Sequence, residues 1–235
     1  MQSSKGDLTL DTSYSLIGYP DLGQKVYQII RDQILTGQLA PGSPLLTVEL
    51  AENLGVSRTP VKDALNRLSA EGLIEDVPRK GYFAARLDVA DVVDMLEARL
   101  MIETVAVERG IGLVQPALLE EMGSLLREME KCVDEGGQFT DYPRFVELDS
   151  RFHQLIVGTA GNRHIGEAHR RLSVHLHISR IHFAAQVGHL RSAATLREHR
   201  AIVDAFAAGD LTAVKGALAD HIESVSRLFA AVKIG

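Results

Sequence analysis

The fold of this chain is decided by residues 41–83, PGSPLLTVELAENLGVSRTPVKDALNRLSAEGLIEDVPRKGYF. Apolar residues recur at helical spacing from Thr47, and Gly55 permits the sharp turn that ends this short helix. Ser57 is placed to cap the next helix, which is expected to run to about Glu71 with its apolar face turned inward. The stretch therefore predicts two helices joined by a tight turn.

A β-hairpin and a further helix flank these two helices. Residues 73–77 and 82–84 are expected to pair as a hairpin around the turn at 78–81. Upstream, an apolar stripe that starts after Asp21 and is closed by Gly37 predicts a helix. Three helices followed by a hairpin is the order of elements in a winged helix-turn-helix.

The second helix of the pair carries a face suited to reading DNA. In a helix-turn-helix this helix enters the major groove, where its N-terminal residues reach base edges. Arg58 can bond guanine bidentately, Thr59 can touch a phosphate or a base, and Lys62 lies one turn beyond Arg58. Each charge alone is equally well explained as a solvated surface group, but the joint pattern favours double-stranded DNA as the partner. The expected DNA-binding residues are Thr47, Ser57, Arg58, Thr59 and Lys62 on the helices, with Arg79, Lys80 and Gly81 at the hairpin tip.

The formal net charge of −6 does not exclude a DNA-binding protein, because the basic residues gather locally. A local basic face is enough to neutralise phosphates, whereas the overall acidity argues against a loosely held, sequence-blind nucleic-acid coat. Between residues 58 and 86 the basic side chains are Arg58, Lys62, Arg67, Arg79, Lys80 and Arg86, against the acidic Asp63, Glu71, Glu75 and Asp76.

Length and composition are those of a globular protein with two unequal domains. The chain has 235 residues, of which 46% are hydrophobic and 24% charged. No apolar run approaches the length of a membrane span, and the N-terminus lacks the pattern of a signal peptide. The single cysteine, Cys132, cannot form an internal disulfide. We therefore expect a cytoplasmic protein with no membrane partner.

The second domain is expected to be entirely helical. The predicted organisation is a polar, mobile arm at 1–20, the winged helix-turn-helix at 21–86 and a helical domain at 87–235. Breaks at proline and glycine separate helical stretches at 88–113, 116–136, 141–160, 162–187, 189–208 and 211–232. The fold class is thus mainly α, with an antiparallel bundle of about six helices following the DNA-binding domain.

Three of these helices place histidine or aspartate on their apolar faces. Asp149 and His153 lie four residues apart beside one apolar stripe, and His199 and His221 each fall in the stripe of another helix. A single histidine on such a face is more often an ordinary core residue, but a buried aspartate needs a cation or strong donors. One aspartate and three histidines suit a divalent transition metal, with zinc preferred over nickel or manganese. The remaining histidines are expected to be mostly surface or packing residues, some facing the pocket: His164, His169, His175, His177, His182 and His189.

The quoted stretch resembles the DNA-binding half of the GntR family of bacterial transcription regulators. The resemblance covers about residues 22–85 and departs from the family at two positions. Val48 stands where the family often has an arginine that contacts phosphate or base, and Lys62 stands where arginine is usual. Lysine keeps the charge but loses the bidentate fork, so a different operator sequence is expected.

The helical domain is similar to the FCD effector domain of the FadR subfamily and, with six helices, to its VanR-type branch. The similarity rests on EARLMIE at 97–103, LDSRFHQLI at 148–156, GN at 161–162 and EHRAIVDAFAAGDLTAVKGALADHI at 198–222. It implies that the metal is held by Asp149, His153, His199 and His221, with coordination positions left open for a small carboxylate effector. It also implies that Arg99 lies near the effector's carboxylate, the alternative being an ion pair with Glu103 within the bundle.

These features together predict a homodimer, joined through the helical domains, that binds a near-palindromic operator. Effector binding is expected to tilt a helix and to act on the DNA-binding domain through the linker at residues 86–90. Two other functions remain open: the ion itself is the signal, or the metal activates water and the domain is a hydrolase or lyase. The enzyme is disfavoured because no general acid–base pair can be identified.

Overall fold

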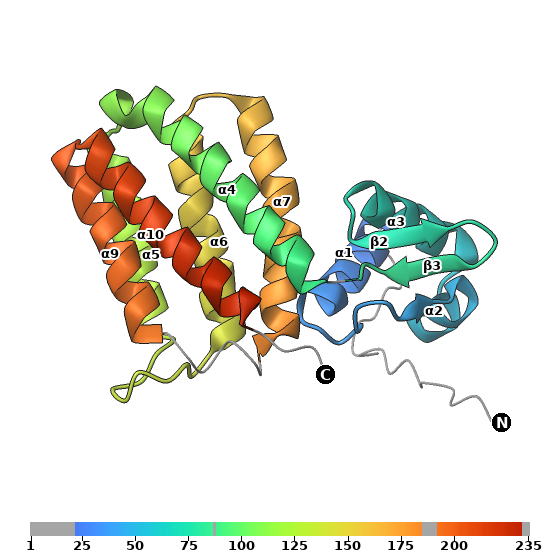
Figure 1. Ribbon diagram of the computed structural model, residues 1–235. Coiled ribbons are helices and arrows are strands. Elements are labelled where there is room, and N and C mark those ends of the chain that lie inside the picture. The colour runs from blue at the N-terminus through green and yellow to red at the C-terminus, as the bar shows by residue number, and fades with distance from the viewer. Residues whose placement is uncertain (1–21, 87, 185–191, 232–235) are drawn as a thin grey trace. The chain divides into compact units, whose positions relative to one another are not determined.

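The chain separates into two compact units, residues 1–86 and 87–235. The computed structural model describes residues 22–86, 88–184 and 192–231 (Figure 1). The arm expected at residues 1–20 lies outside the described residues, as do the helix break expected at Gly188 and the helical residues expected at 185–187 and 189–191.

The N-terminal unit has the helices and the hairpin that the sequence predicts. Helix α1 (Leu22–Leu35) packs on α3 (Arg58–Ala70), which also contacts α2 (Thr47–Leu54). The hairpin strands β2 (Ile74–Val77) and β3 (Gly81–Ala84) pair antiparallel. A short strand, β1 (Pro44–Leu45), pairs antiparallel with the other edge of β3 and gives the sheet order β1-β3-β2. Strand β1 was not expected, because two residues are too few to show an alternating pattern.

The turn between α2 and α3 is formed as expected, except for its cap. Gly55 ends α2 in the left-handed conformation, at φ 64°. Ser57 is the N-cap residue of α3, as expected, and has the extended backbone of a cap, but its side chain makes no capping hydrogen bond. The third residue of α3 is Pro60, which has no N–H to donate to a capping hydroxyl.

The C-terminal unit is a bundle whose helices are antiparallel neighbours around a common core, as Figure 1 shows for the labelled elements. Contacts join α4 to α10, α10 to α9, α9 to α5, α5 to α6, α6 to α7 and α7 back to α4, and α4 also meets α6. The helices form a closed ring, so a side chain turned inward from any of them reaches the same interior. Their bounds are α4 Val89–Gly110, α5 Pro116–Glu130, α6 Tyr142–Gly158, α7 Arg163–His182, α9 Ser192–Ala208 and α10 Leu211–Ala230.

Polar caps fix where several of these helices begin. Asp141 accepts a hydrogen bond from the backbone N–H of Arg144 at 3.0 Å. Asp88, Asn162 and Asp210 cap α4, α7 and α10 in the same way. The helix predicted at 116–136 is shorter than expected and ends at Glu130. Beyond it, residues 133–139 form a turn closed by a bridge between Val133 and Phe139, in which Gly137 takes a φ of 76°.

The bundle interior combines a large apolar core with several buried polar side chains. Phe145, Phe152 and Phe206 are at most 2% exposed and pack in one cluster. The buried polar side chains of the bundle include Arg99, Glu103, Asp149, His153, His169, Arg180, His199 and His221. Burial of so many ionisable groups is costly unless they are paired, so their contacts decide what the interior does. In the part of the chain that the structure describes, no helix has the length and apolar character needed to cross a membrane.

Candidate metal centre

The four residues expected to bind a metal come together in the middle of the bundle. Asp149 and His153 lie one turn apart on α6, His199 comes from α9 and His221 from α10. One ligating atom from each residue lies within 4.8 Å of the others. All four side chains are at most 1% exposed. The i, i+4 spacing on α6 and the ring of helices are sufficient to bring about this convergence.

The hydrogen bonds of the three histidines fix which ring nitrogen is available. Nδ1 of His199 lies 2.8 Å from the carbonyl oxygen of Thr195, Nδ1 of His153 lies 2.7 Å from Glu103 Oε2, and Nδ1 of His221 lies 3.1 Å from Glu198 Oε2. Each partner is an acceptor, so each neutral ring carries its proton on Nδ1. The three Nε2 atoms are therefore bare lone pairs, which is the form in which histidine binds a metal.

Several buried acceptors in this centre face one another without hydrogen bonds. Among the described residues, Asp149 Oδ1, His153 Nε2 and His199 Nε2 make none. Asp149 Oδ1 nevertheless lies 3.1 Å from His199 Nε2. Two lone pairs at this distance repel each other unless a cation lies between them. The donor set of three imidazole nitrogens and one carboxylate oxygen fits zinc and similar divalent transition metals.

Helix α4 supplies an ion pair that supports the centre from one side. Arg99 Nε donates to Glu103 Oε1 at 2.8 Å, and both side chains are buried. Glu103 also contacts His153 and, at 3.1 Å, Nε2 of His169. Burial alone would raise the pKa of Glu103, but His153, Arg99 and His169 outweigh burial and keep this pKa well below its usual range. Glu103 is thus a charged acceptor that orients His153.

Arg99 keeps one donor unused. Its Nη2 atom is buried, lies 3.6 Å from Asp149 Oδ2 and, within the described part of the chain, has no hydrogen-bond partner. Arg99 therefore pairs with Glu103 and at the same time directs Nη2 toward the metal centre. Both alternatives considered for Arg99 from the sequence fit this arrangement.

Arg180 of α7 pairs with the other oxygen of Asp149 and was not identified from the sequence. Its Nη1 donates to Asp149 Oδ2, and the side chain is 9% exposed. Burial opposes ionisation of Asp149, but the attraction of Arg180, together with that of Arg99, holds the pKa of Asp149 well below its usual range. Asp149 is therefore an anion whose Oδ1 is left for a metal.

Two further supporting residues were missed or underestimated. His169 was grouped with residues expected to be mostly surface or packing, yet it is fully buried and bonds Glu103. Glu198 contacts His221 and accepts a hydrogen bond from Ser224 at 3.0 Å. The signal for Glu198 was its place in the run EHR beside His199, whereas nothing in the pattern of α7 marks His169 as inward.

Burial of the histidines predicts that the metal-free protein is sensitive to acid. Burial, assisted by Arg99, lowers the pKa of His153 to about 3, and burial with His199 lowers that of His221 to about 4. Below about pH 6.5 these two histidines take up protons in the unfolded chain, whereas in the folded protein they remain neutral. The free energy of unfolding should therefore decrease as the pH is lowered, by up to about 1.4 kcal/mol per pH unit for each histidine, until the folded pKa values are reached.

Urea denaturation of the metal-free protein between about pH 7 and pH 5 measures this slope. The matched control is His164→Ala, which removes an exposed histidine of α7 and should leave the slope unchanged. A free energy of unfolding that does not change over this range would contradict the assignment of neutral, buried histidines.

The residues expected to contact DNA all belong to the N-terminal unit. Arg58 begins α3, Lys62 lies on its next turn, and both side chains are exposed. Arg79 lies in the turn of the hairpin at a φ of 66°. Ser57, Thr59, Lys80 and Gly81 are exposed as well, and Thr47, the first residue of α2, is half-buried. A hydrogen bond of 2.5 Å from the hydroxyl of Tyr82 to Asn66 Oδ1 joins the hairpin to the outer face of α3.

Comparison with known proteins agrees with both units. Residues 22–83 match the bacterial regulatory proteins of the gntR family, and residues 94–224 match the FCD domain. A transcriptional regulator of the HTH type from Streptomyces ambofaciens is 31% identical over 85% of this chain and 81% of its own length. A probable D-xylose utilization operon transcriptional repressor from Paenarthrobacter nicotinovorans is 30% identical over 91% of each chain.

Solved structures show the same fold. A putative GntR transcriptional regulator from Rhodococcus sp. RHA1 superposes with a TM-score of 0.75 and 21% identity, covering 90% of this chain and 99% of that one. The families and relatives matched are transcriptional regulators and not enzymes. The chain therefore belongs to the GntR family of DNA-binding transcriptional regulators and carries an FCD effector-binding domain.

Proposed function

We propose that this regulator binds its operator with an affinity set by a small carboxylate effector, which binds at a divalent metal held by Asp149, His153, His199 and His221. Zinc is the proposed ion. The observation that carries the proposal is the convergence of unused polar atoms: acceptors from Asp149, His153 and His199, and the Arg99 Nη2 donor, are all buried at one place. The acceptors suit a cation, and the donor suits an anion beside it.

The balance of buried charge favours an anionic effector. Arg99 and Arg180 are positive and Glu103 and Asp149 are negative, so these four groups cancel. A divalent cation adds two buried positive charges, and the partly exposed Glu198 beside His221 carries a single negative charge to offset them. Uncompensated charge is expensive in a protein interior, so an anion that binds with the metal lowers the cost. A carboxylate matches the geometry of the guanidinium of Arg99.

Helix α4 is the element that would carry the signal. It begins at Val89, within the linker expected at residues 86–90, and its buried residues include Arg99 and Glu103. A shift of this helix on effector binding therefore reaches the linker directly. Coupling on the order of 1–3 kcal/mol is enough for a useful change in operator affinity.

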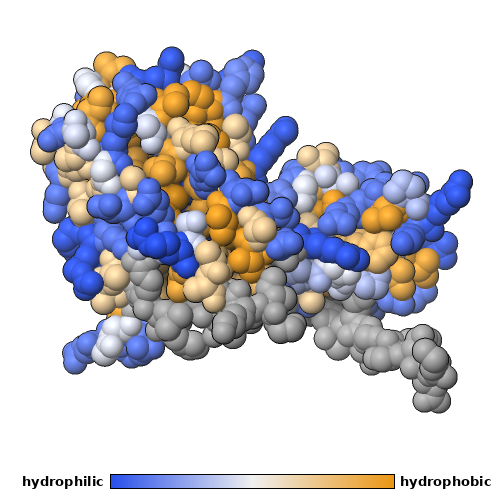
Figure 2. Space-filling view, in the orientation of Figure 1, coloured by the Kyte–Doolittle hydropathy of each residue, from blue (hydrophilic) through white to orange (hydrophobic). Residues whose placement is uncertain are grey.

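The outer face of α4 supports assembly into a homodimer. Met101 and Val105 are one turn apart and are 59% and 45% exposed. Figure 2 shows apolar side chains gathered on the face of the helical unit over α4. Exposed apolar patches of this kind often mark interfaces. We place two copies together through this face, so that two α3 helices enter successive major grooves of a near-palindromic operator in the cytoplasm.

Met101→Glu should therefore weaken the dimer, because it places a charge in an apolar contact. We expect at least about a tenfold rise in the dissociation constant of the dimer, as for the loss of a central interface residue. Analytical ultracentrifugation over a dilution series measures it. Leu113→Glu is the matched control, since Leu113 is 73% exposed but lies beyond the end of α4. Equal dissociation constants for the two variants would place the interface elsewhere.

Thermal unfolding with a panel of small carboxylic acids tests the effector site. A ligand at about one hundred times its Kd raises stability by about 2.7 kcal/mol if it binds only the folded state. We expect at least one acid to raise the Tm of the zinc-loaded protein, but not that of the metal-free protein or of His221→Ala. If zinc alone stabilised the protein and changed operator affinity, and no acid added to it, the ion itself would be the signal. Equal stabilisation of the metal-free protein by an acid would overturn the proposed site.

A further inference from the structure

A tyrosine of the hairpin is hydrogen-bonded to an asparagine of α3. The hydroxyl of Tyr82, on β3, donates to Oδ1 of Asn66 over 2.5 Å. Tyr82 directly follows Gly81, the last residue of the hairpin turn expected to meet DNA. The hairpin also packs on α3 through β2, and Figure 1 shows both strands beside this helix. The bond therefore joins the two elements that carry the expected DNA-binding residues.

Asn66 lies on the face of α3 that carries these residues. It is exposed, and it lies one turn beyond Lys62 and two turns beyond Arg58. About 12 Å of helix separates Asn66 from Arg58, which is the rise of roughly three to four base pairs. Along a groove, the two side chains would therefore meet different base pairs. The opposite face of α3 is buried and consists of Val61, Ala64, Leu65 and Leu68.

The bond from Tyr82 determines which end of the Asn66 amide is left to bind. An asparagine amide accepts hydrogen bonds only at its oxygen and donates only from its nitrogen. Oδ1 is held toward the hairpin, so Nδ2 with its two N–H groups is turned away from the Tyr82 hydroxyl. Tyr82 keeps its proton, because partial burial and the carboxylate of Asp76, its partner on β2, raise the pKa of the hydroxyl. Asn66 is therefore oriented as a donor.

An oriented donor discriminates between the two purines. In the major groove guanine presents two neighbouring acceptors, O6 and N7, whereas adenine presents the acceptor N7 beside the donor N6. An asparagine that turns freely pairs with adenine by using its oxygen and its nitrogen together. In this protein Oδ1 of Asn66 is already bonded to Tyr82, so adenine would have to compete for it. Guanine needs no acceptor from the side chain.

We propose that Asn66 is a further base-reading residue of α3, and that Tyr82 orients it to favour guanine over adenine at one base pair in each half of the operator. The inference rests on the proposed entry of α3 into the major groove. Tyr82 is a positioning residue, since it acts through Asn66 and needs no contact of its own with DNA. Sequence preference then depends on the hairpin as well as on α3.

Selection of the full-length protein on duplexes with a randomised region, followed by sequencing, tests the proposal. Asn66→Ala should remove a guanine preference at one base pair of each half-site, which identifies the pair that Asn66 reads. At that pair Tyr82→Phe should reduce the preference for guanine over adenine by about fivefold or more, because the amide is free to turn. Tyr27→Phe is the matched control. It removes a hydroxyl that donates to Glu71 over 2.7 Å in the same unit, and the base preferences should not change.

Asn66→Asp provides an independent check, because its carboxylate still accepts from Tyr82 but has no N–H to donate. It should lose the guanine preference as Asn66→Ala does. Base preferences that Tyr82→Phe leaves unchanged would overturn the proposal. A uniform loss of affinity in Asn66→Ala, with the preferences intact, would mean that Asn66 contacts only a phosphate and would overturn it as well.

Arg58→Ala in the same selection separates this inference from the proposed function. A change of base preference in Arg58→Ala alone would refute the role of Asn66 and Tyr82 but keep α3 as the reading helix. Unchanged preferences in all of these variants would instead refute the proposed entry of α3 into the major groove.

Discussion

Replacing His199 with alanine should lower the affinity for Zn²⁺ by about two to three orders of magnitude. Four protein ligands together give apparent binding free energies of about 10–16 kcal/mol in structural zinc sites, so each contributes roughly a quarter of that. His199 is fully buried, and its Nε2 faces Asp149 Oδ1. Its loss also removes the ligand from α9 and leaves the site with residues of α6 and α10 only.

Metal content after dialysis, measured by mass spectrometry, and chelator competition check this expectation. The natural protein should retain about one ion per chain, and His199→Ala close to none. His164→Ala, an exposed histidine on α7, should behave as the natural protein does. A variant at His199 that kept both the ion and its affinity would show that the metal binds elsewhere.

Replacing Arg58 with alanine should lower operator affinity by about 1–3 kcal/mol, or roughly 5- to 150-fold, and relax the preference for one base pair. The reason is its place as the exposed first residue of α3, the helix that we propose enters the major groove. Lys62→Ala should weaken binding to all sequences more evenly, since lysine lacks the bidentate fork.

Fluorescence anisotropy with an operator fragment selected from genomic DNA measures both effects. Arg127→Ala, which alters an exposed arginine of α5 in the helical domain, is the control for loss of a positive charge. Metal content should be the same in all three variants. An operator affinity of Arg58→Ala equal to that of Arg127→Ala would exclude Arg58 as a base-reading residue.

The metal ligands could be proposed from the sequence because each lies in or directly beside an apolar stripe. His199 and His221 occupy positions at which helical periodicity demands an apolar side chain, Asp149 and His153 lie directly beside such a stripe, and a buried aspartate requires a cation or strong donors. The fold class could be predicted for the same reason, since periodicity and breaks located the helices. The predicted end of one helix at residue 136 was wrong, because the turn found there depends on a bridge between Val133 and Phe139.

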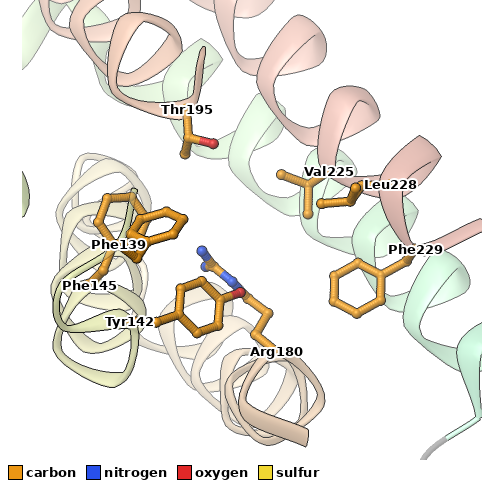
Figure 3. A pocket seen from close by; sticks show the side chains of 8 residues that line it. All are labelled: Phe139, Tyr142, Phe145, Arg180, Thr195, Val225, Leu228 and Phe229. Carbon is orange, nitrogen blue, oxygen red and sulfur yellow. The ribbon is translucent and has the colours of Figure 1, made fainter. Parts of the chain in front are cut away.

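The supporting residues could not be predicted, because their burial depends on neighbouring helices. Helix α7 is rich in histidine and arginine, and periodicity does not show that Arg180 and His169 face inward. The burial of Arg180 is stabilised by its ion pair with Asp149 of α6 and by its hydrogen bond with Tyr142, beside which its guanidinium lies in Figure 3. The role of Glu103 as an acceptor for His153 likewise arises from contact between α4 and α6. Sequence patterns identify a polar residue on an apolar face, but not the partner that stabilises it there.

The most direct test of control by the buried metal centre is operator affinity with and without its ligands. The dissociation constant for the operator fragment is measured by fluorescence anisotropy for the metal-free protein, the zinc-loaded protein, and the zinc-loaded protein with a stabilising acid, in parallel with His221→Ala. We expect zinc and acid together to change the dissociation constant of the natural protein by about 5- to 150-fold, and His221→Ala not to respond. An unchanged dissociation constant in the natural protein, or an equal response in His221→Ala, would contradict it.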